Sequence, residues 1–440
     1  MLRWTIFASV PLCLLLTGCP LTDHYRLQED TLGSAGTHQG GEPGADASAG
    51  NELSNAGLAE RGGGANAGCD VACSVNRPCV ADHCTSGWAS MADPPSMLVA
   101  RSKAASVAMG NAVFIWGGLD SSGAALENGA IYDAQADTWT YLPRDTGSPS
   151  ARIMATAVWT GSASNKVILY GGSDAAGGMI YRDGAVYDVL GNSWSALPGN
   201  MMLSKRSAPY GYWDGTRAVF FGGQGGMMTV VPGADRFDLK GWSTSMAMGD
   251  PGLLGFPAIA FDGSVMYLQG GVIMGMRQDK VFAYTSSTDT WSSLSKSLSP
   301  RTGAFGAWDG SAFVVWGGED DMGMRADGKT MTGTRWSEMT EPSTLSPRRI
   351  AFRRSGWAFQ VEPGVVGIIG GQTSTLGTGN VLATDGATYA VQSGEWTEIP
   401  SWPSLESHEY GIGVWTGKEF VLWGGRTQNL PTLTGERWTP

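Results

Sequence analysis

Basic side chains recur at one position relative to a repeated glycine pair. Arg101, Arg206 and Arg301 each lie 16 residues before the first glycine of such a pair, and His408 lies at the same offset before its own pair. A planar guanidinium group makes paired hydrogen bonds to carboxylate and sulfate groups. The full set therefore predicts a ring of groups that binds an anionic ligand: Arg101, Arg152, Arg206, Arg301, Arg348 and His408.

A second arrangement of residues could transfer protons. The segment Glu-Ser-His-Glu-Tyr carries Glu406, His408 and Glu409, and Arg301 could hold an anion beside them. Such groups could supply the acid, the base and the anion clamp of a carbohydrate-modifying enzyme. Three such residues in one loop also fit a solvated turn.

Methionine is frequent in the segments that follow the glycine pairs. The sequence Met-Gly-Met-Arg occurs twice, as Met274 with Met276 and as Met322 with Met324; Met179, Met227 and Met228 follow other pairs. Thioethers are soft ligands that suit Cu(I), and they are also adaptable contacts for a partner. Loop packing is the third alternative.

The N-terminus is typical of an exported protein. Arg3 precedes an apolar stretch too short to span a bilayer, and the stretch ends in Leu-Thr-Gly-Cys19. This ending resembles the lipobox of bacterial lipoproteins. The resemblance implies cleavage after residue 18 and lipidation of Cys19, and Pro20 favours the outer membrane over inner-membrane retention. We therefore expect a signal peptide over 1–18 and an anchor that holds the mature chain in the cell envelope, facing either side of the outer membrane.

Two segments separate this anchor from the remainder of the chain. Residues 19–67 are rich in Gly, Ala and Ser, which predicts a flexible tether. Residues 68–86 hold four cysteines, namely Cys69, Cys73, Cys79 and Cys84. An exported chain meets an oxidising compartment, so two disulfides are expected, with three possible pairings. A zinc site is the alternative.

From residue 87 onward the sequence repeats itself seven times. Each copy has an apolar run that ends in Gly-Gly, and the first glycines are Gly117, Gly171, Gly222, Gly270, Gly317, Gly370 and Gly424. A strand joined by a tight turn precedes each run, often at Asp-Gly, which favours a type I′ hairpin. A strand centred on an aromatic residue follows, and then a strand with Trp. Each copy therefore predicts a four-stranded antiparallel meander.

A unit of about 50 residues with Gly-Gly, then Tyr, then Trp resembles the kelch motif. The resemblance implies an all-β, seven-bladed β-propeller of four-stranded blades over residues 87–440, whose first strands line the central channel. It also offers a structural role for the arginines, because kelch arginines often pair with acids inside the ring. Since some kelch-type proteins are sugar epimerases or mutarotases, the resemblance implies that type for the enzyme alternative with His408 and the channel arginines. The connections into the first strand and from the second to the third strand share one end of each blade, here called the top face.

The last copy lacks its fourth strand. Trp438 occupies its Tyr position, whereas Trp88 precedes Arg101 by the 13 residues that also separate Trp139 from Arg152. We therefore expect the strand with Trp88 to complete the last blade and close the ring. Trp336 is predicted to fill the Tyr position of the fifth copy, leaving that copy without its usual Trp.

Composition narrows the functions further. The net charge of −11 argues against a nucleic-acid partner. The chemistry of galactose-oxidase-like copper enzymes cannot be assembled, since the repeats hold one histidine and no cysteine follows Cys84. The sequence thus favours a monomeric binding module that recognises a protein or polysaccharide through the top face and needs no cofactor.

Overall fold

The computed structural model describes most of the repeat region and two short strands before it. The described residues are 79–80, 83–84, 87–225, 231–245, 255–273, 275–296, 298–342, 352–375, 379–427 and 430–440. All regular elements in these ranges are β-strands, in agreement with the predicted all-β class. No helix with the length and apolar character needed to cross a bilayer occurs in them. The predicted signal peptide, Cys19, the tether, Cys69 and Cys73 lie outside the described residues.

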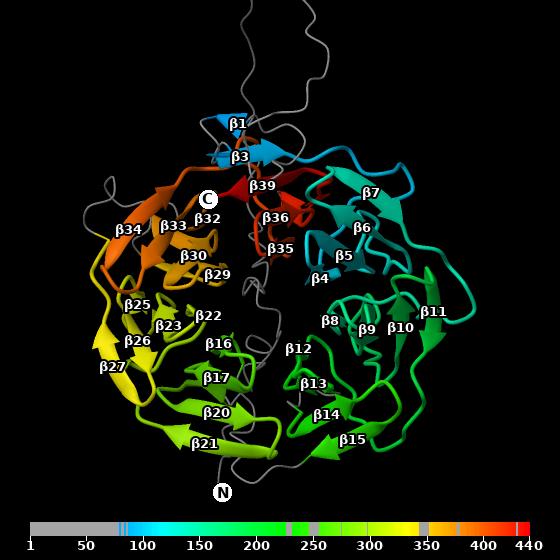
Figure 1. Cartoon of the computed structure of the whole chain (residues 1–440), viewed down its shortest axis with the longest axis horizontal. Helices are drawn as coiled ribbons and strands as arrows, with labels where there is room; N and C mark the ends of the chain where they lie inside the picture. The colour runs from blue at the N-terminus through cyan, green and yellow to red at the C-terminus, as the bar shows by residue number, and fades with distance from the viewer. Residues whose placement is uncertain are drawn as a thin grey trace, which may run out of the picture.

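Seven four-stranded antiparallel sheets make up the main body, and Figure 1 shows them arranged in a ring. Sheet 1 contains β4 (Ala105–Met109), β5 (Ala112–Trp116), β6 (Gly129–Asp133) and β7 (Thr138–Tyr141). Sheet 2 contains β8 (Thr156–Trp159), β9 (Lys166–Tyr170), β10 (Gly184–Asp188) and β11 (Ser193–Ala196). Sheet 3 contains β12 (Tyr210–Trp213), β13 (Ala218–Phe221), β14 (Ala234–Phe237) and β15 (Trp242–Ser245). Sheet 4 contains β16 (Ala258–Phe261), β17 (Val265–Gln269), β20 (Val281–Thr285) and β21 (Thr290–Leu294).

The remaining sheets follow the same order. Sheet 5 contains β22 (Phe305–Trp308), β23 (Phe313–Trp316), β26 (Gly328–Thr332) and β27 (Arg335–Glu338). Sheet 6 contains β29 (Trp357–Glu362), β30 (Val365–Ile369), β33 (Gly386–Ala390) and β34 (Glu395–Ile399). Sheet 7 contains β35 (Ile412–Trp415), β36 (Phe420–Trp423), β39 (Gly435–Thr439) and β3 (Gly87–Ser90). In each sheet the first of these strands lies nearest the centre of the ring (Figure 1).

Three short hairpins and one three-stranded sheet adjoin the glycine pairs of sheets 4 to 7 on the top face. They are β18 (Val272–Ile273) with β19 (Met276–Arg277), β24 (Glu319–Asp320) with β25 (Gly323–Met324), β28 (Arg353–Arg354) with β31 (Gln372–Thr375) and β32 (Gly379–Leu382), and β37 (Arg426–Thr427) with β38 (Leu430–Pro431). A separate hairpin, β1 (Cys79–Val80) with β2 (His83–Cys84), precedes sheet 7.

The Asp-Gly turns differ in detail from the predicted type I′ turns. Asp214 flanks the turn between β12 and β13, and its carboxylate accepts hydrogen bonds from the backbone N–H groups of Thr216 and Arg217. Gly215, with φ of 95°, is the first central residue of this turn. Glycine at that position is typical of a type II′ turn, and the aspartate side chain stabilises the turn from outside it.

Sheet 5 corrects the predicted role of Trp336. Met331 pairs with Trp336 between β26 and β27, just as Tyr284 pairs with Trp291 in sheet 4. Met331 therefore occupies the Tyr position, and Trp336 occupies the usual Trp position. The connection at Gly333 is short, so Trp follows the Tyr position by five residues here, as it does in sheet 3.

Tryptophan indoles link neighbouring sheets through one repeated hydrogen bond. The Nε1–H of Trp139 donates to the Ala92 carbonyl at 2.9 Å, and that of Trp194 donates to the Pro143 carbonyl at 3.1 Å. Each acceptor lies just past the fourth strand of the preceding sheet. In the same way, the Nε1–H of Trp336 donates to the Ser295 carbonyl and that of Trp396 donates to the Thr340 carbonyl.

The strand β3 repeats the contacts of the fourth strands of sheets 1, 2, 5 and 6. Trp88 pairs with Trp438 of β39, and its Nε1–H donates to the Pro400 carbonyl of sheet 6 at 2.7 Å. Its ring also packs edge-on against Trp402, with centroids 5.7 Å apart. The N-terminal strand and the C-terminal strand thus lie side by side in one sheet (Figure 1).

Candidate binding face and axial pocket

A belt of residues with positive φ surrounds the centre of the ring, just before the first strands. Six belt residues are not glycine, and the seven members are Lys103, Met154, Ala208, Phe256, Gly303, Ser355 and Tyr410. The backbone N–H of Lys103 donates to the Tyr410 carbonyl of sheet 7 at 2.9 Å, and that of Met154 donates to the Lys103 carbonyl at 3.0 Å. Hydrogen bonds between sheets thus compensate the cost of the left-handed conformation.

The arginines two residues before the belt are buried and bonded within their own sheets. Arg101, Arg152, Arg206 and Arg301 are each 1% exposed, and each donates to the carbonyl of the first glycine in its pair. Arg206 also pairs with the buried Asp235 at 2.7 Å. Burial lowers the pKa of Arg101 to about 10, so this group stays charged at neutral pH. These contacts favour the structural role that the kelch resemblance offered, because the guanidinium groups turn into the protein.

Sheet 6 uses a different arginine from the predicted Arg348, which lies outside the described residues. Arg353 is 1% exposed and bonds to the Asp385 carbonyl at 3.0 Å and to the Asp385 carboxylate at 2.5 Å. It precedes Gly370 by 17 residues, so it occupies the position that the Ser-Pro-Arg match assigned to Arg348.

His408 takes the same position in sheet 7. Its Nδ1 lies 2.6 Å from the Gly424 carbonyl, and its Nε2 lies 3.2 Å from a carboxylate oxygen of Glu436. The side chain is fully buried. The imidazole therefore replaces the guanidinium group of the other sheets, with Glu436 as its acidic partner.

The residues of the catalytic alternative each have a partner of their own. Glu406 accepts hydrogen bonds from the hydroxyls of Thr432 and Thr434, and Glu409 pairs with Arg426 at 2.8 Å. Arg301 belongs to another sheet and pairs with Asp327 at 2.9 Å. The structure does not bring these groups together around a common accessible point.

The predicted copper ligands lie on two hairpins of the top face. Met276 of β19 is 64% exposed, Met324 of β25 is partly buried, and Met322 between β24 and β25 is 89% exposed. Met274, Met227 and Met228 lie outside the described residues. Copper binding at this set stays a prediction. Within the described ranges, His, Cys, Asp and Glu form no group of three or more that could hold a metal.

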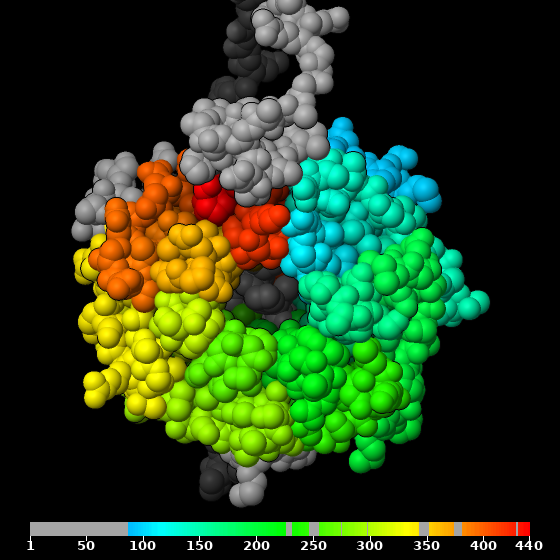
Figure 2. Space-filling model, viewed as in Figure 1, coloured from blue at the N-terminus to red at the C-terminus, as the bar shows by residue number. Residues whose placement is uncertain are grey.

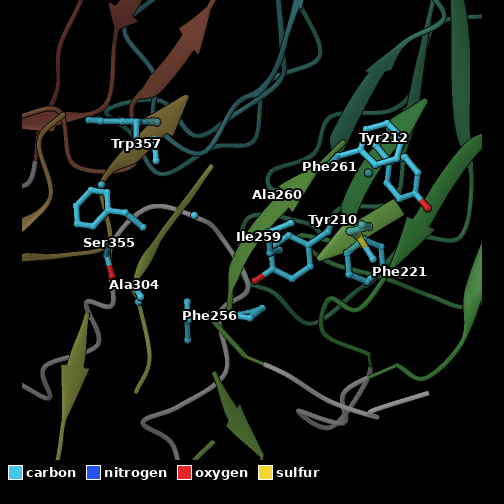
Figure 3. A pocket seen from close by; sticks show the side chains of 18 residues that line it. Tyr210, Tyr212, Phe221, Phe256, Ile259, Ala260, Phe261, Ala304, Ser355 and Trp357 are labelled. Carbon is cyan, nitrogen blue, oxygen red and sulfur yellow. The ribbon is translucent and has the colours of Figure 1, made fainter. Parts of the chain in front are cut away.

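A pocket of about 340 Å³ lies inside the ring beside sheets 3 to 6. Figure 3 shows Tyr210, Phe256 and Ile259 on one side and Ser355 and Trp357 on the other. The surface of the molecule is also hollowed at the centre of the ring, as the space-filling model shows (Figure 2). The remaining lining residues are Gly211, Tyr212, Phe221, Pro257, Ala260, Phe261, Met266, Gly303, Ala304, Phe305, Gly306, Gly356 and Ala358.

None of the residues that line this pocket carries a charge. Burial raises the pKa of Tyr212 far above neutral, so its hydroxyl stays protonated. The rings of Tyr212 and Phe261, tilted to each other with centroids 4.4 Å apart, form part of the wall. The pocket volume is near the lower end of the range for ligand pockets, which is about 300–1,000 Å³. It can therefore bind an uncharged group, but it offers no charged acid or base.

The sequence interpretation missed this pocket. One signal was available: the first strands of sheets 3 and 6 read Tyr-Gly-Tyr-Trp and Trp-Ala-Phe-Gln, richer in aromatics than Ala-Ser-Val-Ala-Met in sheet 1. Packing between sheets decides which of these rings face a cavity. The residues that pack together come from distant parts of the sequence, so the pattern within one strand does not predict it.

Comparisons with known proteins support the fold. Residues 103–297 match the family model described as the KLHDC2/KLHL20/DRC7 Kelch-repeats domain, which supports the prediction of a kelch-repeat protein. No curated protein matches the chain. A solved structure titled "Structure of YjhT" is 19% identical with a TM-score of 0.50, and the match covers 70% of this chain and 99% of that one. At this identity the likeness shows the fold alone.

Proposed function

We propose that this kelch-repeat chain is a binding module of the cell envelope, held by a lipid on Cys19. In this proposal the seven sheets are the blades of one closed propeller, sealed by the pairing of β3 with β39. A protein or polysaccharide partner is bound at the top face and at the axial pocket, and the molecule acts as a monomer.

One observation carries the proposal: the pocket at the ring axis has no charged lining residue. Proton transfer needs a titratable group within hydrogen-bond reach of the substrate. The groups that could have served, His408 and the buried arginines, are instead bonded inside the sheets. Binding without turnover is what such a site can do.

A paired assay separates binding from catalysis. We expect the full chain to capture a component of the envelope, or a glycan on an array, and to leave a broad panel of sugars unchanged. The variant Trp357→Ala should weaken capture, because it removes a wall of the pocket. Turnover of any sugar that is lost in the His408→Gln variant, while that variant stays folded, would instead establish the enzyme.

The anchor has its own test. Metabolic labelling with a fatty-acid analogue should mark the wild-type chain and leave Cys19→Ala unlabelled. Labelling of that variant would exclude Cys19 as the lipidated residue.

A further inference from the structure

The exposed apolar side chains are distributed very unevenly between the two ends of the ring. Thirteen large apolar side chains of the described residues are exposed, and twelve of them lie in top-face connections. These twelve are Met97, Val99, Met179, Met201, Met202, Met276, Met322, Phe352, Val381, Leu405, Leu430 and Leu433. Leu190, in the connection between β10 and β11, is the single exception and lies on the opposite face. Single exposed apolar residues are ordinary, whereas exposed apolar residues that lie close together on one face mark an interaction surface.

Polar contacts hold the loops that carry these side chains next to one another. Arg182, near Met179, donates to the Met201 carbonyl at 2.9 Å. Arg277, beside Met276, forms an ion pair of 2.9 Å with Asp321, beside Met322. The apolar residues therefore come in neighbouring pairs from different connections.

Polar contacts also join the loops that carry exposed apolar residues in sheet 7. The Thr427 hydroxyl donates to the Ser407 carbonyl at 2.8 Å, which joins the loop of Leu405 to the hairpin of Leu430. Contacts between loops thus fix the relative positions of the apolar residues on both sides of the ring.

Phe352 is held in an unusual conformation at this surface. Its φ is 63° and its exposed fraction is 52%. A bulky residue with positive φ is a genuine outlier, and such strain clusters at functional sites. The next residue, Arg353, donates a hydrogen bond to the carboxylate of Asp385.

We propose that the top face docks an apolar surface of a protein partner, through a contact area dominated by methionine. This rests on the proposed binding function and names the partner's class. Six of the twelve side chains are methionine, whose flexible and polarizable thioether adapts to more than one protein surface.

The chemistry of the surface disfavours other occupants. A polysaccharide brings many hydroxyls, and covering them with apolar side chains would leave them without hydrogen bonds. A membrane surface is usually met by exposed Trp, Tyr, Lys and Arg, whereas the exposed apolar set in the described residues holds no Trp or Tyr. The net charge of −11 also repels anionic lipid.

Site-specific photo-crosslinking in the full chain tests the proposal in the cell that makes it. The crosslinker p-benzoyl-phenylalanine replaces Met276, Met322 or Leu405, and Leu190 serves as the matched exposed position on the opposite face. We expect one protease-sensitive species at two or more top-face positions and none at Leu190. That species, once purified, should bind the double variant Met276→Glu and Met322→Glu at least tenfold more weakly than wild type, while Leu190→Glu stays within twofold.

The other outcomes are equally decisive. Because Met276 and Met322 are largely exposed, the glutamate variants should keep the wild-type melting temperature. Capture of a protease-resistant glycan or of lipid, or equal capture at Leu190, overturns the inference and leaves the proposed binding function standing. A crosslinked species of twice the chain mass assigns the face to self-association and also overturns it. No capture at any position, together with no glycan binding on an array, overturns both proposals.

Discussion

At the scale of single residues, the buried arginines connect each glycine pair to the loop that precedes the first strand. The guanidinium group of Arg206 donates to the carbonyls of Gly222, Val231, Pro232 and Gly233. Its fifth bond, to Asp235, joins two buried charges. Removing one partner of a buried ion pair leaves the other charge without compensation, which costs about 3–5 kcal/mol.

We therefore expect Arg206→Ala to lower the free energy of unfolding by about 3–5 kcal/mol. Denaturant titration followed by circular dichroism measures the change, and the neighbouring exposed Lys205→Ala should stay within about 0.5 kcal/mol of wild type. An Arg206→Ala variant with wild-type stability and weakened partner binding would restore the ligand-binding role that the sequence predicted.

Asp145 makes stability depend on acid pH. Its carboxylate accepts hydrogen bonds from the backbone N–H of Trp194 at 2.9 Å and of Gly147 at 2.8 Å. The bond from Trp194 is the main cause that holds the pKa of Asp145 below its ordinary value. Since the folded-state pKa is the lower one, the stabilisation is complete above the unfolded pKa of about 3.9 and is lost as pH falls through the folded pKa.

The variant Asp145→Asn should flatten part of this acid dependence. We expect a small effect, because the carboxylate is exposed and its interactions are screened by solvent. Urea midpoints measured between pH 2 and 6 check the slope. A wild-type slope in the variant would show that other carboxylates account for the whole dependence.

The residue types and their offset from the glycine pairs were visible in the sequence, but their orientation was not. A repeat pattern fixes where an arginine lies along the chain, whereas the direction of its guanidinium group depends on carbonyls contributed by distant segments. The position of Arg353 was missed for a local reason: the Ser-Pro-Arg match with Arg301 pointed to Arg348, whereas the arginine bonded inside sheet 6 lies five residues further along the chain.

At the scale of strands and hairpins, turn length decides which aromatic occupies which position. Trp336 lies five residues past Met331, while Trp291 lies seven past Tyr284, yet both tryptophans pair in the same way. The spacing rule taken from the longer turns therefore misassigned the shorter one. In sheets 5 and 6 this shared pairing brings the indole of Trp336 and of Trp396 to a carbonyl of the preceding sheet.

The hairpin before sheet 7 suggests one disulfide. Cys79 of β1 lies directly opposite Cys84 of β2, with Val80 opposite His83 next to a connection of two residues. Residues directly opposite in an antiparallel pair have Cα atoms about 4.5–5.5 Å apart, within the range that a disulfide spans. We predict a Cys79–Cys84 bond and, from the four cysteines, a Cys69–Cys73 bond.

Peptide mapping of the unreduced mature protein checks this pairing. A linked peptide that contains Cys79 and Cys84 is expected, and it should disappear on reduction. A Cys79–Cys69 or Cys79–Cys73 linkage would contradict the prediction, and four free thiols that bind one zinc ion would favour the metal alternative.

At the scale of the whole molecule, the repeats and the register of Trp88 were sufficient to predict an all-β ring-forming chain. They were not sufficient to predict the apolar top face or the axial pocket. Both depend on which side chains remain uncovered after seven sheets pack, and loops of different length decide that. Met202 and Leu190 have similar exposures of 77% and 84%, and only the topology tells that they lie on opposite faces.

The pairing of β3 with β39 joins the N-terminal part of the ring to its C-terminal strand. If β3 is an integral strand, a chain that begins at residue 95 exposes the edge of β39 and loses the contacts of Trp88 with Trp438, Pro400 and Trp402. An unpaired strand edge invites association with other chains, and loss of a fully buried Trp costs about 3–5 kcal/mol, so the half-buried Trp88 accounts for less.

We therefore expect the chain that begins at residue 95 to melt at least 10 °C below a chain that begins at residue 86, and to form soluble aggregates on size-exclusion chromatography. The longer chain is the matched control, because it keeps β3 and removes the same leader. The point variant Trp88→Ala should fall between the two. Equal melting temperatures and a monomeric elution for both truncations would mean that the ring holds together without β3, and the closed-propeller proposal would then be wrong.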